Sequence, residues 1–331
     1  MTDAFDRGLW RELADDRVPD GLIRRRVLPS LAHDVFIGEL RPGRERVLIM
    51  EIAGEHTGLP PRRPSSKGLK VEVEDAEPDM VRIRLTSMAR ADWSLFAEVA
   101  NDVAATLSAD PGAGAAKRVL NRVVSWQNFF ATKRDDFSLE LAAGLFSELH
   151  VLSEVFLPTL GAGRAVAAWC GPDPAVQDFQ LATLALEVKS FRGAGPGRLL
   201  ISSELQLDLA GVDSLFIAYV RLDQRQDGSG PTLLDAINTV REALVESPPA
   251  LDLFEHRLLS YGWVDSFAEY RTEKYDVRTS EAFRVTEGFP RITPASLPNG
   301  VGGVTYAVDR SAIEAFLVPW EDLAEMLKEL A

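Results

Sequence analysis

Three charged residues interrupt a stretch of the chain that is otherwise typical of β-structure. The segment DFQLATLALEVKSF contains Asp178, Glu187 and Lys189 among apolar and β-branched residues. If its second half forms a strand, Glu187 and Lys189 lie on the same face, roughly 6.8 Å apart along the strand. If the first half pairs with that strand through a tight turn at Ala182 and Thr183, Asp178 lies opposite Glu187. The pattern therefore predicts two facing carboxylates beside a lysine.

Two facing carboxylates repel each other unless a cation lies between them. Directly opposed residues have Cβ atoms roughly 4.5–5.5 Å apart, and Mg²⁺, which Mn²⁺ can replace, prefers carboxylate, water and phosphate oxygens. Asp178 and Glu187 are therefore candidate metal ligands, and Lys189 is a candidate to orient an attacking water or stabilise transition-state charge. The alternative is a turn aspartate and two solvent-facing strand residues. Ala-Thr is also a poor two-residue hairpin loop, so a bulge could shift the facing pair.

A third carboxylate and a glutamine extend the candidate site. Glu148 falls beside an apolar stripe at helical spacing, where a carboxylate needs a partner such as a metal or metal-bound water. The alternatives are a boundary residue that reaches solvent, or Glu154 in its place. Gln206, in the segment ISSELQLD after the lysine, is a further catalytic candidate or an ordinary surface glutamine. The stripe consists of Leu145, Leu149, Leu152 and Phe156.

The elements that must position these side chains can be predicted from periodicity and turn residues. The first hundred residues are typical of a β-rich unit. The strands expected there are 33–40, 46–54, 69–76 and 80–87, after a helix at 3–16 and before a helix at 94–110. A helical region follows from about 116 to 160, then a β-rich core at 164–191. Further strands are expected at 198–209, 214–223, 275–288 and 303–309, and helices at 232–247, 250–262 and 320–330.

Composition excludes several classes of site. A single cysteine, Cys170, excludes an internal disulfide and a multi-cysteine zinc cluster, and the four histidines show no paired-ligand spacing. No apolar run reaches about 18 residues and the N-terminal segment is acidic and amphipathic, so we expect a cytoplasmic protein without a membrane span. The net charge of −14 argues against a surface that coats nucleic acid broadly. Charges balance in residues 1–90, so an anion-binding face is expected in the first half of the chain.

Several segments together resemble a known family. A helix with a glutamate, a strand, a strand that begins with Asp and a strand with E-x-K follow one another in PD-(D/E)XK nucleases. The segments AWCGPDPAVQDFQLATLALEVKSF, ISSELQLD, YGWVD, VTEGFPRIT and GVGGVTYAVD resemble an uncharacterised bacterial PD-(D/E)XK family. Its members are associated with restriction and phage-defence gene clusters. The resemblance covers most of the chain.

The resemblance implies a fold and a set of site residues. The expected fold is α/β (α+β), with an N-terminal β-rich domain at 1–110, a restriction-endonuclease-like core at 111–246 and a C-terminal extension packed on the core at 247–331. Asp178, Glu187 and Lys189 would carry the D, E and K of the family, and Glu148 its helix carboxylate. Such families often have HDF where this chain has Gln177 before Asp178, so a catalytic role for that preceding position is not carried over.

The resemblance also implies a function. The implied activity is that of a Mg²⁺-dependent DNA endonuclease that leaves 5′-phosphate and 3′-hydroxyl ends. The implied partners are products of neighbouring genes, such as a helicase-like or MORC-type ATPase and a DNA methyltransferase. An oligomer is compatible with this function. The alternative is a non-catalytic nuclease-fold subunit that binds DNA or acts as a scaffold in a defence complex.

A nuclease must hold a polyanion, and each phosphate contact from Lys or Arg adds salt-dependent affinity. The candidate DNA-binding residues lie in two groups in the first half of the chain. One group is in a Pro-rich loop, where prolines reduce the ordering cost of binding, and the other is at the entry to the helical region. The two groups are Arg62, Arg63 and Lys67, and Lys117, Arg118 and Arg122.

Overall fold

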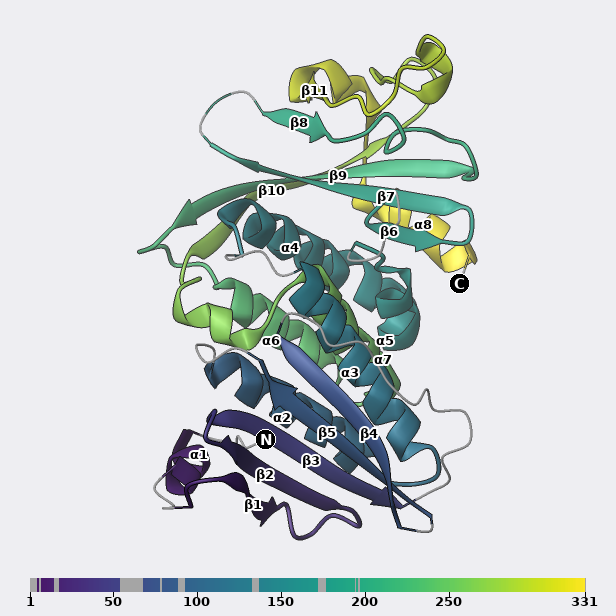
Figure 1. Cartoon of the computed structure of the whole chain (residues 1–331). Helices are drawn as coiled ribbons and strands as arrows, with labels where there is room; N and C mark the ends of the chain where they lie inside the picture. Colours follow the sequence, from purple (N-terminus) through teal and green to yellow (C-terminus); the bar gives the residue numbers. More distant parts are fainter. Residues whose placement is uncertain are drawn as a thin grey trace. The chain divides into compact units, whose positions relative to one another are not determined.

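The computed structural model divides the chain into two compact units, residues 1–135 and 136–331. Each unit is described by itself, and both are drawn in Figure 1. The structure describes residues 5, 7–14, 18–53, 68–77, 79–88, 93–132, 137–171, 177–193, 195 and 197–330.

The first unit is built on an antiparallel sheet with the strand order β1-β2-β3-β5-β4. Its strands are β1 (Gly21–Val27), β2 (Asp34–Arg41), β3 (Glu45–Ala53), β4 (Leu69–Glu77) and β5 (Met80–Ser87), and its helices are α1 (Arg7–Ala14), α2 (Trp93–Ala109) and α3 (Ala115–Thr132). Alternate residues of β5 are buried, as expected for a strand with one face on a core. The four predicted strands are confirmed. Strand β1 was not predicted, because its centre is Arg24-Arg25-Arg26.

Helix α3 belongs to the first unit, although the sequence placed the domain boundary near residue 110. The guanidinium of Arg122 on α3 forms two hydrogen bonds, of 2.6 and 2.7 Å, to the carboxylate of Asp102 on α2. The ring of Phe130 lies so close to Gly68 that a Cβ there would be 2.3 Å from it. These contacts join α3 to elements before residue 110, and they explain why the boundary falls after residue 135.

The second unit is built on a mixed five-stranded sheet with the strand order β12-β10-β9-β7-β6. Its strands are β6 (Phe179–Leu181), β7 (Leu184–Arg192), β9 (Ser214–Arg225), β10 (Lys274–Arg284) and β12 (Leu317–Val318). Strands β7 and β9 are parallel, and the other neighbours are antiparallel. Strands β8 (Arg198–Ile201) and β11 (Tyr306–Asp309) form a separate pair. The mixed α/β class predicted from the sequence is therefore confirmed.

Two hydrophobic cores flank this sheet. The larger core contains residues of the helices and the side chains of Leu184, Leu186 and Val188 from β7. The smaller core contains Ala185 from the opposite face of β7, together with residues of β8 and β11. Figure 1 shows the helices on one side of the sheet and the β8–β11 pair on the other. Strand β7 is thus covered on both faces, so a charged residue in it is held away from bulk water.

The helices of the second unit begin with one long, interrupted helical segment. It consists of α4 (Leu139–Val151), a π-helical turn η1 (Leu152–Phe156) and α5 (Leu157–Ala168), and Ser138 caps its start by accepting a hydrogen bond from the Leu141 N–H. Residues 164–168 were predicted as part of a β-rich core, and they form the end of α5 instead. The later elements are α6 (Leu233–Leu244), α7 (Pro248–Tyr261), α8 (Trp320–Leu330) and the 3₁₀ turns Asp265–Glu269, Pro294–Ser296 and Arg310–Phe316.

One helical segment of the described chain, Leu139–Ala168, is long and apolar enough to cross a membrane by length and composition alone. Within it, 61% of the apolar window is buried inside the unit. Its apolar residues, such as Leu145, Leu149 and Leu152, belong to the larger core against the sheet. The segment is therefore accounted for as a core helix.

Candidate active site

A tight hairpin brings the first two candidate residues together. Residues Phe179–Leu181 pair with residues 184–186 in antiparallel register, with Phe179 opposite Leu186. Ala182 and Thr183 form the turn, as the sequence predicted, and Ala182 takes a positive φ of 50°. One further step of the same register places Asp178 opposite Glu187. No bulge shifts the pair.

Glu187 and Lys189 lie on the same face of β7 and contact each other directly. Lys189 Nζ is 2.7 Å from Glu187 Oε1. Gln206 links the two residues, because its Nε2 donates to Glu187 Oε1 at 2.8 Å and its Oε1 accepts from Lys189 Nζ at 3.1 Å. The structure therefore places Gln206, a candidate from the sequence, in contact with Glu187 and Lys189. Its amide fixes the relative position of the carboxylate and the ammonium group.

The second oxygen of Glu187 is the unusual atom of the site. The residue is 2% exposed, and its Oε2 is buried without a hydrogen-bond partner among the described residues. Burial raises the pKa of Glu187 to about 8, and the negative charge of Asp178 acts in the same direction. A buried, unpaired carboxylate oxygen is costly. A bound cation would remove that cost, so this oxygen is a candidate metal ligand.

Asp178 is held in place by the strand that it faces. The backbone N–H of Val188 donates to Asp178 Oδ2 at 2.7 Å, and the backbone carbonyl of Asp178 accepts from the Cys170 N–H at 2.7 Å. Burial raises the pKa of Asp178 to about 6, while the Val188 N–H and the charge of Lys189 oppose that rise. The carboxylate is therefore fixed beside Glu187.

Glu148 joins the site from α4. Trp169 Nε1 donates to its Oε2 at 2.7 Å, and the Tyr261 hydroxyl donates to its Oε1 at 2.8 Å. Burial, followed by the charge of Asp178, raises the pKa of Glu148 well above its usual value. Gly171 is needed here, because a Cβ at that position would lie 2.2 Å from Glu148 Oε2. The structure thus places Glu148 near the hairpin, with one neutral donor on each oxygen.

Sequence reasoning missed Trp169 and Tyr261. Tyr261 lies 113 residues after Glu148, at the end of α7, so no local spacing connects the two. The segment YGWVD that contributed to the family resemblance begins at this tyrosine. Trp169 follows α5 and stacks on Tyr261, with ring centroids 6.5 Å apart. Only the tertiary packing of α5 and α7 brings both donors to α4.

Hydrogen bonds from several segments hold the loop that carries Gln206. The Ser202 N–H donates to Gln206 Oε1 at 2.9 Å, and Gln177 Nε2 donates to the Gln206 backbone carbonyl at 3.2 Å. Arg291 Nη1 donates to the carbonyl of Leu207 at 2.6 Å. In the same loop, the carboxylate of Glu204 accepts from the N–H groups of residues 303 and 304. These contacts make the position of Gln206 depend on the segment 291–304.

The predicted DNA-binding residues lie in different environments, and some lie outside the described residues. Arg62, Arg63 and Lys67 lie outside the described residues. Lys117 is exposed on α3. The guanidinium of Arg118 donates to the carbonyls of residues 110, 112 and 113 and pairs with the Asp110 carboxylate, so it closes the turn before α3.

Arg122 was also predicted to contact DNA, and this prediction does not fit the structure. The residue is 8% exposed, and its guanidinium is paired with the Asp102 carboxylate. The spacing of the three basic residues on α3 could not show that the third one faces α2. Arg122 is therefore a structural residue of the first unit.

The carboxylates of the site can be compared with the ligands that the predicted Mg²⁺ needs. In the described part of the chain, no group of three or more His, Cys, Asp or Glu side chains is arranged to hold a metal ion. Mg²⁺ needs fewer protein ligands, because it is commonly bound by one or two carboxylates plus waters and substrate oxygens. Asp178 and the unpaired Oε2 of Glu187 fit that requirement. Glu154, the competing candidate, lies in the π-helical turn and is not among the residues that contact this set.

Comparison with known proteins gives one match. The model of the family described as "Putative PD-(D/E)XK family member, (DUF4420)" matches residues 7–311. No curated protein and no solved structure matches the chain. The matched range covers most of both units and includes Glu148, the β6–β7 hairpin and the loop that carries Gln206. The chain therefore belongs to this PD-(D/E)XK family.

Proposed function

We propose that this protein is a metal-dependent DNA endonuclease that hydrolyses phosphodiester bonds in a bacterial restriction or phage-defence system. Membership of the PD-(D/E)XK family supports a nuclease-like fold. The observation that carries the proposal is the buried, unpaired Oε2 of Glu187, opposite Asp178 and two residues before Lys189. A structural strand would have no use for this combination of charges.

Asp178 and Glu187 are the residues that would hold Mg²⁺ or Mn²⁺. When bound, such an ion polarises a phosphoryl oxygen and lowers the pKa of bound water. Glu148 stands behind the pair, oriented by Trp169 and Tyr261. Its two oxygens each keep a lone pair after accepting these bonds, so it can accept a further donor such as a water.

Lys189 supplies a fixed positive charge. Its ammonium group is anchored by Glu187 Oε1 and Gln206 Oε1, and the side chain is 12% exposed, which allows contact with a phosphate. A preorganised cation stabilises the charge that develops on phosphoryl oxygens without reorganising during the reaction. Lys189 therefore orients the nucleophilic water or stabilises the transition state, and Gln206 positions Lys189.

The direct test is cleavage of supercoiled plasmid by the purified chain in the presence of Mg²⁺ or Mn²⁺. We expect nicked and linear products with either ion, none with EDTA, and none from Glu187→Gln. The matched control is Glu246→Gln, which makes the same change on the exposed surface and should cleave like the wild type. Metal-independent cleavage, or equal cleavage by Glu187→Gln, would contradict the proposal.

A second candidate function is a non-catalytic DNA-binding or scaffold subunit of a defence complex. The net charge of −14 favours it, because an acidic chain is a poor lone DNA binder. The same plasmid experiment separates the two functions. A subunit without activity would leave plasmid intact alone and with the ATPase or methyltransferase of its gene cluster, which we propose as its partners in the cytoplasm. An enzyme that needs loading would cleave only with them.

We also propose that the Pro-rich loop holds DNA through Arg62, Arg63 and Lys67. The test is DNA binding across a salt series with these three residues changed together to Ala. Each lost phosphate contact should reduce the salt slope by roughly one. The control is Arg44→Ala, at an exposed position. Arg122 is not used as a control because its guanidinium is buried and paired with Asp102. An unchanged slope in the triple variant would exclude this contact.

A further inference from the structure

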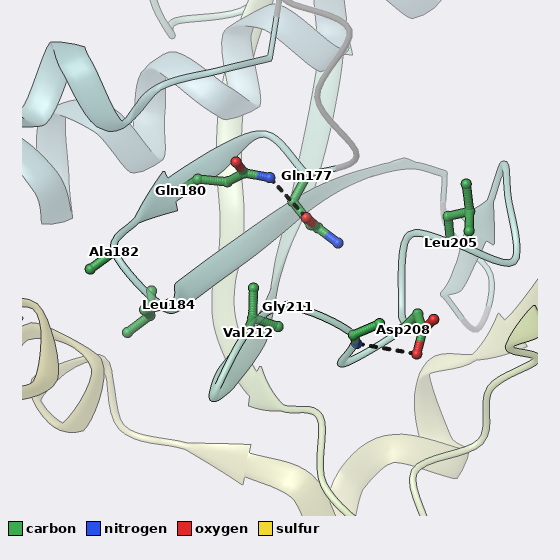
Figure 2. A pocket seen from close by; sticks show the side chains of 9 residues that line it. Gln177, Gln180, Ala182, Leu184, Leu205, Asp208, Gly211 and Val212 are labelled. Atoms are coloured by element: carbon green, nitrogen blue, oxygen red, sulfur yellow. Dashed lines mark hydrogen bonds between the residues drawn. The ribbon is translucent and has the colours of Figure 1, made fainter.

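A pocket opens beside the candidate active site, between the β6–β7 hairpin and the loop that carries Gln206 (Figure 2). Its volume is about 260 Å³, below the roughly 300–1,000 Å³ of sites that enclose a whole drug-sized ligand. It therefore suits one small group. The lining residues are Gln177, Gln180, Ala182, Leu184, Leu205, Asp208, Ala210, Gly211 and Val212.

The pocket is joined to the site by a chain of hydrogen bonds. Gln180 Nε2 donates to Gln177 Oε1 at 3.1 Å, and Gln177 Nε2 donates to the backbone carbonyl of Gln206. The side chain of Gln206 in turn holds Glu187 and Lys189. Along β7, Leu184 in the pocket wall is three residues from Glu187, or about 10 Å. A stacked strand advances about 3.4 Å per nucleotide, so this separation is a few nucleotides.

The chemistry of the pocket excludes a phosphate and fits a base. None of the described residues that line it is cationic, and the carboxylate of Asp208 would repel an anion. One oxygen of that carboxylate, Oδ1, accepts from the Ala210 N–H at 3.3 Å. Among the described residues, Asp208 Oδ2 and Gln180 Oε1 have no partner. Both side chains are at least partly exposed to solvent, so these oxygens are free to accept from donors on a ligand, and the exocyclic amino groups of cytosine, adenine and guanine are such donors.

The apolar wall completes the pocket. Leu205 is 46% exposed at the edge of the pocket. Val212 and the buried Leu184 also line it. Figure 2 shows Leu205 on the segment that also carries Asp208, while Gln177 and Gln180 belong to the hairpin side. A flat ring placed between these two sides would cover Leu205 with its face and present its edge to the polar groups.

We propose that this pocket receives one base of the DNA strand near the scissile phosphate, and that Asp208 selects bases with an exocyclic amino group. The proposal rests on the proposed nuclease function, because that function brings a nucleotide strand to Glu187 and Lys189. It adds a source of base preference that the family resemblance does not supply. Cytosine and thymine give the cleanest comparison, since both are pyrimidines and only cytosine has the amino group.

The experiment measures binding of fluorescent oligo-dC and oligo-dT to the full chain in EDTA, which prevents metal-dependent cleavage. The oligomers have about a dozen nucleotides, within the roughly 4–16 that single-strand sites cover. We expect wild-type protein to bind oligo-dC about fivefold more tightly, the lower end of the discrimination given by one good polar contact to a base. Asp208→Asn should abolish the preference. Asp213→Asn, the same change at an exposed residue of the same loop, should keep it.

Oligomer binding and the thermal midpoint of a second variant separate loss of a base contact from loss of the fold. Leu205→Ala, at an exposed position, should weaken binding of both oligomers without lowering the thermal midpoint, because it removes the contact to the base face. Equal binding of the two oligomers by wild type, or a preference that survives Asp208→Asn, would overturn the pocket assignment alone if plasmid is still cleaved. Failure to bind either oligomer, together with failure to cleave plasmid, would overturn the proposed function and this inference together.

Discussion

Each unit of the protein contains a carboxylate that accepts hydrogen bonds from buried or partly buried side chains, and the oxygens of the two carboxylates are partnered differently. In the first unit, Asp102 accepts two hydrogen bonds from the Arg122 guanidinium and one of 2.6 Å from Trp126 Nε1. In the second unit, Glu187 shares one oxygen between Lys189 and Gln206, and the other oxygen is buried without a described partner. Both carboxylate oxygens of Asp102 therefore accept hydrogen bonds from described residues, whereas Oε2 of Glu187 accepts none from them. We expect this difference between a structural ion pair and a candidate binding site.

The two units also differ in the charges that surround the carboxylate, because Glu187 has other carboxylates near it. Beyond the effect of burial, the charge of Asp178 raises the pKa of Glu187, and the charges of Asp178 and Glu187 raise the pKa of Glu148. Asp102 instead faces a cation and an indole. A protein that only needed stability would gain from removing such a cluster, because buried charges without full compensation are costly. The charges of the second unit therefore make sense as binding groups.

The largest expected effect is on the stability of the first unit. Asp102→Ala leaves the buried Arg122 guanidinium without its partner, and breaking a buried pair in this way costs roughly 3–5 kcal/mol. Denaturant unfolding measures the change. The control is Asp110→Ala, which removes a carboxylate that is 60% exposed and paired with Arg118, and should cost about 1 kcal/mol or less. Equal effects of the two changes would mean that the Asp102 cluster has no special structural role.

The next effect is on cleavage. Lys189→Ala removes the cation that we propose stabilises the transition state, so plasmid cleavage should fall by roughly 10²-fold or more. Metal binding should persist, because an ammonium group is not a ligand. Lys328→Ala removes the same charge from the exposed face of α8 and should cleave normally. Near-normal cleavage by Lys189→Ala would remove this residue from the mechanism.

A smaller effect is expected behind the site. Tyr261→Phe removes one of the two donors to Glu148 and leaves Oε1 buried, which should lower the unfolding free energy by roughly 1–3 kcal/mol. The comparison variant is Tyr270→Phe, at a 43% exposed tyrosine, which should change stability little. If Tyr261→Phe is neutral, the phenol is not needed to hold Glu148, and the carboxylate must be oriented by Trp169 alone.

The parts of the fold and site that the sequence predicted are those encoded locally. The turn at Ala182 and Thr183 is short, so the alternation of residues in β7 was enough to place Asp178 opposite Glu187. The apolar stripe of α4 likewise placed Glu148 toward the core. Gln206 lies within 20 residues of Lys189 and was identified as a candidate, although its role as a link between two side chains was not.

The parts that were missed depend on contacts between distant segments. Arg122 could be placed on a helix, but not on the side of that helix that faces Asp102. Tyr261 reaches Glu148 only because α7 packs on α5. An apolar run such as RAVAA fits a buried strand or a buried helix equally well by periodicity, and here it continues α5. The domain boundary lies after α3 for the same reason, since residues earlier in the chain, such as Asp102 and Gly68, contact this helix.

We infer that Asp178 and Glu187 of the second unit bind a divalent cation. Isothermal titration with Mn²⁺ tests this inference most directly. We expect the wild-type chain to bind Mn²⁺ and Asp178→Ala to lose that binding. The control Asp213→Ala, which changes an exposed carboxylate two residues beyond the pocket loop's Gly211, should bind like the wild type. Undiminished binding by Asp178→Ala, with the control unchanged, would contradict the assignment of the site to Asp178 and Glu187.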